Sequence, residues 1–313
     1  MDLIADIGAT NTRCALLNDK GRELAPEVFQ NAEFTGLAGL LKVYLDHRRS
    51  SDRPKRAALA IAAPLVGDDV RMTNIDWQFS QTELKDELGL TRLFLCNDFT
   101  AVAWGLPKLT AADLKTVGGG SPASHAPLAT LGPGSGLGVS ALIPSMDNWV
   151  AITGEGGHVS APAATDEEAQ VVERIRRKFG HCSAERLLSG PGLVNLYVAL
   201  ADMAGRGDPT VTPSDVTSLA KQGEPLARKA QSMFFAMLGT VAGDVALTFG
   251  ARGGVYIAGG IVPRFLDAFV KSDFRARFED KGRYRSYMKA IPTHVITAER
   301  PAFRGLRHIL GYR

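Results

Sequence analysis

The sequence predicts an α/β protein with two lobes, and three observations lead to this fold class. The chain has 313 residues, more than the roughly 100 to 200 of one ordinary domain. Residues 2–18 and 128–143 each read as a short apolar strand, a glycine-containing loop and a second strand. Residues 107–129, which lead into the second of these segments, are rich in proline, glycine and serine and lack a hydrophobic period. They predict a connection between lobes.

The first lobe is expected to alternate strands and helices. Strands are predicted at 2–8, 12–18, around Val28 and Phe29, at 56–64 and at 91–96. Residues 37–48 carry apolar side chains at helical spacing, which predicts a crossover helix before the buried strand 56–64. Ser80 and Glu83 form a capping-box pattern that begins a second helix. We expect this lobe to end near Lys108.

The second lobe repeats the opening pattern and then becomes mostly helical. After the strand pair 128–143, the segment 148–153 is a third strand. Helices are predicted at 166–180, capped by Thr165 with Glu168, at 192–203 and at 224–249. Residues 205–215 are predicted as a surface loop, and strands are expected within 253–263 and 293–297.

Composition places the chain among globular proteins of a reducing compartment. Hydrophobic residues make up 45% and charged residues 22%, and the net charge of +3 gives no sign of a nucleic-acid partner. Three widely spaced cysteines, Cys14, Cys96 and Cys182, do not suggest a disulfide framework. No secretory leader is visible, and the apolar stretch from Met233 is broken by glycines and Asp244, so we expect a cytoplasmic protein that does not span a membrane.

The first candidate for chemistry is "DIGATNTR", residues 6–13. Backbone amides and hydroxyls around Gly8, Thr10 and Asn11 suit a phosphate, and Asp6 can approach a metal ion through water. Glycine lets phosphate approach the backbone closely. Taken alone, such a hairpin is more often a plain turn.

The second candidate is "LGPGSGLG", residues 131–138. It is not the dinucleotide-binding fingerprint, because a strand and not a helix follows, and it lacks the Gly-Lys-Ser/Thr of a Walker A loop. Each lobe therefore opens with a glycine turn between strands. This pairing predicts a nucleotide bound between the lobes, with a phosphate cradle from each side.

These two motifs and "GGVYIAGG" resemble the phosphate and adenosine motifs of the sugar kinase, actin and heat-shock chaperone superfamily. More narrowly, "MTNIDWQFS", "NDFTAVA", "GEGGHV", "SAERLLSGPGLVNLY" and "AGGIVPRF" resemble the bacterial ATP-dependent glucokinase family, over residues 3–297. The resemblance implies a two-lobed actin-like ATPase (ribonuclease H-like) fold, with mixed sheets flanked by helices and the active site in the interlobe cleft. It implies a small lobe of residues 1–108 plus about 299–313, a large lobe of 109–298, and a homodimer.

The stretch "LFLCNDFTAVAWGL", residues 93–106, places Asp98 where a buried strand meets a helix. Ligands gather at such strand ends, although an aspartate there is also explained as a helix N-cap. The family resemblance implies that Asp98 is the catalytic base that takes the proton of the glucose 6-hydroxyl as the γ-phosphate of ATP is transferred. It also implies a sugar-binding set, namely Asn97, Asp98, Glu155, His158 and Glu185.

For the nucleotide, the resemblance implies Mg²⁺ with ATP, with Asp6 near the metal through water. The implied nucleotide-binding residues are Asp6, Gly8, Ala9, Thr10, Asn11, Gly132, Gly134, Ser135, Gly136, Gly259 and Gly260. The chain departs from the family in having Ala9 in place of a second glycine, and Ala302, Phe303 and Arg304 in place of a glycine-rich segment before the last helix. The second departure leaves open how that helix docks.

Several alternatives stay open at this point. One alternative is a kinase for another hexose, such as mannose or an N-acetylated hexosamine. Its selectivity would depend on the room that the site leaves around C2 of the sugar. A sugar-sensing regulator is disfavoured, since no helix-turn-helix segment precedes the first strand, and a chaperone-type or actin-type ATPase would lack the sugar constellation. A zinc site is not expected, because Cys182 beside His181 is a single pair. The basic residues of 271–289 are interpreted as a solvated face.

Overall fold

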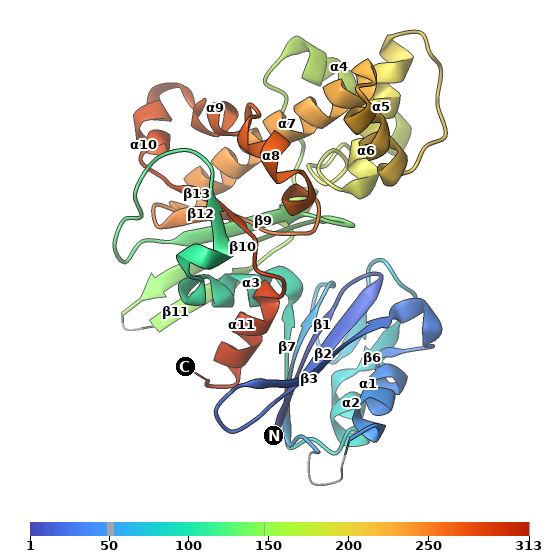
Figure 1. Cartoon of the computed structure of the whole chain (residues 1–313), viewed down its shortest axis with the longest axis vertical. Coiled ribbons are helices and arrows are strands. Elements are labelled where there is room, and N and C mark those ends of the chain that lie inside the picture. Colours follow the sequence, from blue (N-terminus) through green and yellow to red (C-terminus); the bar gives the residue numbers. More distant parts are fainter. Residues whose placement is uncertain (49–52, 147, 313) are drawn as a thin grey trace. The chain divides into compact units, whose positions relative to one another are not determined.

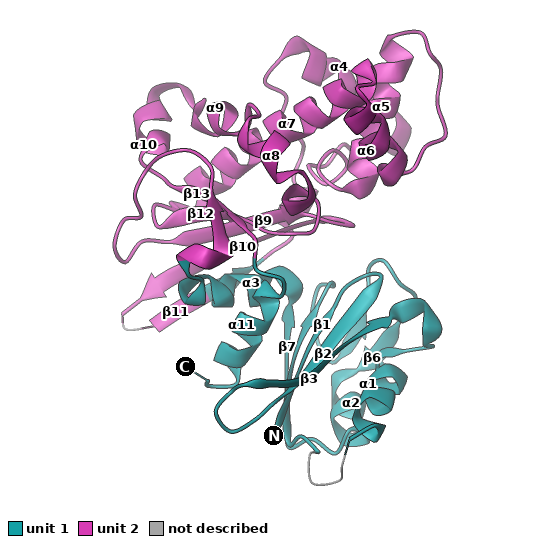
Figure 2. Ribbon diagram, in the orientation of Figure 1, with its two compact units in different colours: residues 1–110, 151–153, 298–313 teal, residues 111–150, 154–297 magenta. Residues whose placement is uncertain are grey.

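A computed structural model describes residues 1–48, 53–146 and 148–312. The chain divides into two compact units, coloured separately in Figure 2. Unit 1 comprises residues 1–110, 151–153 and 298–313, and unit 2 comprises residues 111–150 and 154–297.

Unit 1 is built on a mixed sheet of five strands in the order β3-β2-β1-β4-β7 (Figure 1). Its strands are β1 (Asp2–Ile7), β2 (Asn11–Leu17), β3 (Glu23–Gln30), β4 (Arg56–Ile61) and β7 (Arg92–Asn97). The first three form an antiparallel meander, whereas β1, β4 and β7 run parallel. A small antiparallel pair, β5 (Asp69–Arg71) and β6 (Gln78–Ser80), completes the strands of this unit. The predicted strands of the first lobe are confirmed.

Helices cover both faces of this sheet. In Figure 1, α1 (Leu37–Asp46) and α2 (Gln81–Glu87) lie on one face, and α3 (Asp98–Gly105) and α11 (Pro301–Ile309) lie on the other. Five apolar residues of α1 are buried, as their helical spacing predicts, and they share one core cluster with residues of β1, β2 and β4. Ser80 caps α2, since its hydroxyl oxygen accepts a hydrogen bond of 3.1 Å from the amide of Glu83.

The last helix, α11, docks on α3 by a close approach of the two backbones. A Cβ on Gly305 would overlap the carbonyl oxygen of Ala101, and one on Gly105 would lie 2.9 Å from the carbonyl oxygen of Pro301. The segment 302–304, which differs from the family pattern, lies in this helix. Phe303 is buried, and Arg304 donates to the carbonyl oxygen of Lys108 at 2.7 Å. The docking left open by the sequence is thus achieved by small residues on both helices.

Unit 2 contains a mixed sheet of six strands in the order β11-β10-β9-β12-β13-β8, except that residues 151–153 of β11 are grouped with unit 1. The strands are β8 (Leu114–Thr116), β9 (Leu128–Pro133), β10 (Leu137–Ser145), β11 (Asn148–Thr153), β12 (Gly254–Ile257) and β13 (Thr293–Ile296). β9 pairs antiparallel with β10 and parallel with β12. The sequence analysis missed β8, a short edge strand in the segment interpreted as a connection.

The helices of unit 2 pack around a long central helix. They are α4 (Asp166–Phe179), α5 (Gly190–Met203), α6 (Pro213–Gln222), α7 (Pro225–Phe249), α8 (Leu266–Val270), α9 (Phe274–Glu279) and α10 (Arg285–Lys289). By length and composition α7 could cross a membrane, but 72% of its most apolar window is buried inside the protein. The sequence analysis missed α6, although Thr212 and Asp215 form a complete capping box at its start.

Short 3-10 helices join several of these elements. They are η1 (Asn31–Glu33), η3 (Leu106–Lys108), η4 (Ala111–Asp113), η5 (Gly156–His158), η6 (Val262–Phe265) and η7 (Gly282–Tyr284).

The interpretation of residues 271–289 as a solvated basic face is wrong for three of its cations. The side chains of Arg275, Arg277 and Lys281 are only 14%, 15% and 11% exposed. Arg277 makes two hydrogen bonds, of 2.8 and 2.9 Å, to the buried carboxylate of Glu168 on α4. Arg277 and Lys281 connect α9 and the residues after it to α4 and α7, whereas Arg275 connects α9 to the segment 288–293. A count of charges along the sequence does not reveal these contacts.

Candidate active site

In unit 1, strand register brings the first glycine loop and Asp98 to one edge of the sheet. Ile7 of β1 is opposite Ile61 of β4, which is opposite Asn97 of β7, and all three strands run parallel. Gly8 and Asp98 each follow directly, so they leave the sheet at the same level. Two strand spacings separate them, about 10 Å. Strand ends of this kind are where open α/β sheets bind ligands.

The helix cap at this edge is Asn97 and not Asp98. The side-chain oxygen of Asn97 accepts hydrogen bonds from the amides of Phe99 and Thr100, at 3.0 and 3.3 Å. Asp98 is the first residue of α3, and its carboxylate also accepts from the amide of Phe99, at 2.9 Å. The alternative in which Asp98 is the N-cap is therefore wrong. A carboxylate in the first turn is stabilised by the helix dipole.

The first glycine loop is held from outside by a residue that the sequence analysis missed. Asn31, which is buried, donates from its side chain to the carbonyl oxygen of Gly8 at 2.8 Å and from its backbone to that of Thr10 at 2.9 Å. Its side-chain oxygen accepts from the hydroxyl of Thr12 at 2.8 Å. The loop also closes on itself, because the amide of Gly8 donates to the carbonyl oxygen of Asn11. A lone asparagine after a strand was the only signal for this role.

Asp6 lies near the end of β1, next to this loop. Burial raises the pKa of its carboxyl group, and Arg13, whose guanidinium nitrogen is 3.7 Å away, opposes that rise. The side chain keeps 22% of its exposure. In the part of the chain that the structure describes, no three His, Cys, Asp or Glu side chains group as a metal site. A divalent ion here would thus take most of its ligands from phosphate and water, as Mg²⁺ does in nucleotide sites.

In unit 2, the second glycine loop is enclosed by two other elements. Residues 134–136 join β9 to β10, and the amide of Gly134 donates to the carbonyl oxygen of Gly136 at 2.8 Å. The amide of Gly190, the first residue of α5, donates to the carbonyl oxygen of Gly134 at 2.8 Å. Ser135 is exposed at the tip.

The glycine pair after β12 packs directly against the base of this loop. Gly259 has a φ of +84°, and a Cβ there would overlap the carbonyl oxygen of Pro133. A Cβ on Gly132 would overlap the backbone of Ala258. The predicted phosphate residue Gly132 and the predicted adenosine residue Gly259 therefore belong to one packed structure.

The three predicted sugar-binding residues of unit 2 lie beside the same loop. His158 is in η5, where its amide donates to the carbonyl oxygen of Glu155 at 2.9 Å. The Nε2 atom of His158 is 3.9 Å from Oε1 of Glu185. The other carboxylate oxygen of Glu185 accepts from the amide of Leu137, at 2.8 Å. All three side chains are at least partly exposed and able to meet a ligand.

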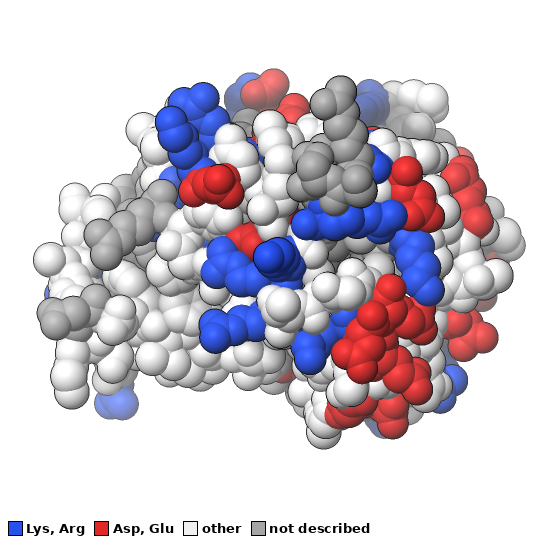
Figure 3. Space-filling view, turned by 90° about the horizontal axis from the view of Figure 1, so that it is seen from below, with Lys and Arg blue, Asp and Glu red and all other residues white. Residues whose placement is uncertain are grey.

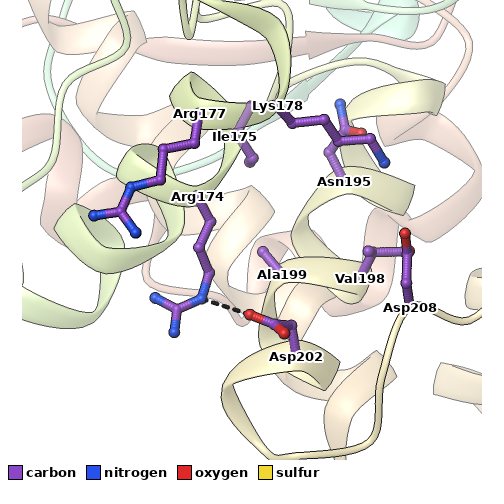
Figure 4. Close-up of a pocket in the computed structure, with 9 residues that line it drawn as sticks. All are labelled: Arg174, Ile175, Arg177, Lys178, Asn195, Val198, Ala199, Asp202 and Asp208. Atoms are coloured by element: carbon purple, nitrogen blue, oxygen red, sulfur yellow. Dashed lines mark hydrogen bonds and ion pairs between the residues drawn. The ribbon is translucent and has the colours of Figure 1, made fainter.

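Two cavities lie in unit 2 away from these side chains. One of about 340 Å³, between α4 and α5, is shown in Figure 4. Two of its lining residues, Arg174 and Asp202, form an ion pair of 2.9 Å across it. A second, of about 540 Å³, is lined by residues of α6, the start of α7 and the segment 263–268 that follows the glycine pair. Neither contains a predicted sugar-binding residue among its lining residues.

Charged side chains of both signs are present on the face that Figure 3 shows. On the face shown in Figure 3, basic and acidic side chains both gather in small groups, and neither sign covers the face. This agrees with the net charge of +3.

The two mixed sheets, each with a glycine loop between antiparallel strands, are those of the actin-like ATPase fold. A family model for glucokinase matches residues 3–312. A glucokinase of Paramagnetospirillum magneticum is 49% identical over 308 residues, which cover 98% of this chain and 96% of that protein. One of Nitrobacter hamburgensis is 46% identical over the same shares. The crystal structure of a glucokinase from an Antarctic psychrotroph has a TM-score of 0.88 and 32% identity, covering 100% of this chain and 99% of its own. The chain belongs to the glucokinase family.

Proposed function

We propose that this protein transfers the γ-phosphate of ATP to the 6-hydroxyl of glucose, giving glucose 6-phosphate and ADP. The observation that carries the proposal is the register of β1, β4 and β7, by which the first glycine loop and Asp98 follow strands that end at one edge of the sheet. The family to which the chain belongs supports the same reaction. ATP-dependent kinases of this kind work with a divalent metal ion.

In the proposed reaction, Asp98 is the general base. The O6–H bond breaks as the bond from O6 to the γ-phosphorus forms, the proton passes to the Asp98 carboxylate, and ADP leaves with the electrons of the broken P–O bond. Because the transition state is loose, most of the catalysis lies in alignment and in charge stabilisation.

The remaining site residues receive the following roles. The side-chain oxygen of Asn97 is engaged in capping, so its NH₂ group is the part that donates to the sugar. Glu155, His158 and Glu185 bind the sugar hydroxyls. The phosphates are bound by residues of the two loops, which are Gly8, Ala9, Thr10 and Asn11 in unit 1 and Gly132, Gly134, Ser135 and Gly136 in unit 2. Gly259 and Gly260 lie near the adenosine, and Asp6 meets Mg²⁺ through water.

Mg²⁺ would neutralise charge on the β- and γ-phosphates. The residues present fit it, since Asp6 offers one partly exposed carboxylate beside the loop. A location in the cytoplasm and assembly as a homodimer stay predictions. Light scattering after gel filtration measures the oligomeric state.

The test is a coupled assay of glucose 6-phosphate formation with the wild type and Asp98→Asn. The expected result is a loss of about 100-fold or more in kcat with glucose binding largely kept, as for removal of a general base. Asp86→Asn, at an exposed aspartate of α2, is the matched control and is expected to turn over like the wild type. Equal turnover by Asp98→Asn would refute the assignment.

Selectivity among hexoses is tested in the same assay. Glucose, mannose and N-acetylglucosamine are compared by kcat/KM. We expect glucose to have the highest kcat/KM. Equal turnover of N-acetylglucosamine would refute glucose as the specific substrate.

A further inference from the structure

Glu185 has two different neighbours, one for each carboxylate oxygen. Oε1 faces Nε2 of His158 at 3.9 Å, on the side proposed to bind the sugar. Oε2 accepts a 2.8 Å hydrogen bond from the amide of Leu137, the residue directly after the loop 134–136. One side chain thus contacts both the proposed sugar ligands and the end of the second phosphate loop.

The Glu185 carboxylate occupies the space that a side chain at position 136 would fill. A Cβ on Gly136 would overlap Oε2 of Glu185 and lie 3.1 Å from its carboxyl carbon. Gly134, in the same loop, has no atom within 4 Å of its would-be Cβ and has no positive φ. The two loop glycines therefore differ in a way that an experiment can use.

The backbone around Glu185 is held from two sides, so a displaced carboxylate moves by rotation of its own side chain and not by a shift of the main chain. Its amide donates to the carbonyl oxygen of Gly157 in η5 at 2.8 Å. Its carbonyl oxygen accepts from the hydroxyl of Ser189 at 2.8 Å, and Ser189 caps α5. Helix α5 in turn donates, from Gly190, to the carbonyl oxygen of Gly134. The loop is held at its first residue by α5 and just beyond its last residue by Glu185.

We propose that Glu185 is a positioning residue that couples the sugar site to the second phosphate loop, so that sugar and nucleotide each strengthen the binding of the other. A sugar hydroxyl that donates to Oε1 of Glu185 disperses the negative charge of this carboxylate, which would otherwise repel the phosphates. The same hydrogen bond fixes the Glu185 side chain, whose other oxygen accepts from the amide of Leu137. Because the Glu185 carboxylate lies against Gly136, a change in the loop that displaces this carboxylate alters sugar binding even without nucleotide, whereas a loop change that leaves it in place does not. This inference rests on the proposed function.

The test measures glucose affinity by calorimetry in the absence of nucleotide, for the wild type, Gly136→Ala and Gly134→Ala. Gly136→Ala is expected to weaken glucose binding about tenfold or more, the effect of displacing a charge-assisted hydrogen bond. Gly134→Ala, which adds the same methyl group to the same loop, is expected to keep glucose affinity within about twofold of the wild type. Equal glucose affinities for all three proteins would overturn the coupling.

A second pair of variants covers the case in which Gly136→Ala fails to fold. In Glu185→Ala, the carboxylate is absent, so the added methyl group of Gly136→Ala has nothing to displace. The double variant that combines Glu185→Ala with Gly136→Ala is expected to fold and to bind glucose as weakly as Glu185→Ala alone. If Gly136→Ala acted by disturbing the whole loop, the double variant would bind glucose more weakly than Glu185→Ala. A further loss in the double variant would contradict the proposal.

The coupling itself is measured by titrating the Mg²⁺ complex of a non-hydrolysable ATP analogue with and without saturating glucose. In the wild type we expect glucose to strengthen analogue binding at least about fivefold, and in Gly136→Ala this factor is expected to fall toward one. If the wild type forms glucose 6-phosphate but shows no such factor, only the coupling fails. If it neither binds nor phosphorylates glucose, the proposed function fails as well.

Discussion

Asn97 caps the helix of which Asp98 is the first residue. The Asn97 side-chain oxygen accepts hydrogen bonds from the amides of Phe99 and Thr100, so Asn97 is the helix cap. The neighbouring Asp98 carboxylate is the proposed general base. The orientation of α3, and with it the position of the Asp98 carboxylate, depends on a residue that is also proposed to bind the sugar.

Two substitutions separate these roles of Asn97. Asn97→Ala removes both the capping oxygen and the amide donor, so it is expected to cost about 1 kcal/mol of stability and to weaken glucose binding. Asn97→Ser restores a capping oxygen but has no amide, so it is expected to recover stability without recovering glucose affinity. Urea unfolding and glucose calorimetry measure the two effects. Normal glucose binding by Asn97→Ser would reduce Asn97 to a cap.

The contact between α3 and α11 is tested with two helical glycines. Gly305→Ala places a methyl group where the carbonyl oxygen of Ala101 lies, and the forced separation of the helices is expected to cost about 1 to 3 kcal/mol. Gly39→Ala, on the exposed side of α1 with no atom near, is expected to stabilise the protein by up to about 1 kcal/mol through helix propensity. Thermal unfolding compares them. Similar shifts in both variants would show that the helices are not in close contact.

The buried pair of Glu168 and Arg277 predicts a large loss of stability when one partner is neutralised. Glu168→Gln leaves the charge of Arg277 buried without its partner, which is expected to cost about 3 kcal/mol. Glu173→Gln, on the same helix, removes an exposed pair with Arg176 and is expected to cost much less. Urea unfolding at pH 7 distinguishes them, and equal losses would contradict burial of the first pair.

The same pair predicts a pH dependence. Burial opposes ionisation of Glu168, but hydrogen bonds from Arg277 and from the amide of Ala164 outweigh it and lower its pKa below the usual value. The resulting stability is fully present above the pKa of an unfolded glutamate, about 4.3, and is lost as the pH falls through the lower folded value. The difference in stability between the wild type and Glu168→Gln is therefore expected to shrink below about pH 4. A difference that stays constant with pH would exclude this pair as its source.

The cysteines are expected to be unreactive in the folded protein. Burial, together with Asp98 and Asp6, raises the pKa of Cys96 to about 12, and burial raises that of Cys182 to about 11. Cys14 is fully buried and its pKa is raised as well. Since the thiolate is the reactive form, a thiol reagent at pH 8 should label none of them rapidly, and all 3 in urea. Rapid labelling of a cysteine without urea would contradict this burial.

Local patterns in the sequence were sufficient for much of this protein. Strand, glycine loop and strand are contiguous in each half, so the two hairpins could be predicted from neighbouring residues. The caps at Ser80 and Thr165 and the buried face of α1 likewise depend on residues three or four apart. The motifs that resemble glucokinases are also local, and so the candidate residues could be named before any fold was known.

Contacts between distant residues were decided only by the tertiary structure. The role of Asn31 at the first loop, the pairing of Arg277 with Glu168 and the docking of Gly305 on Ala101 each join segments far apart in the chain. So does the hydrogen bond from Leu137 to Glu185, which links the second glycine loop to the proposed sugar site. Such pairings depend on which surfaces fold together, and periodicity or spacing along one segment carries no information about them.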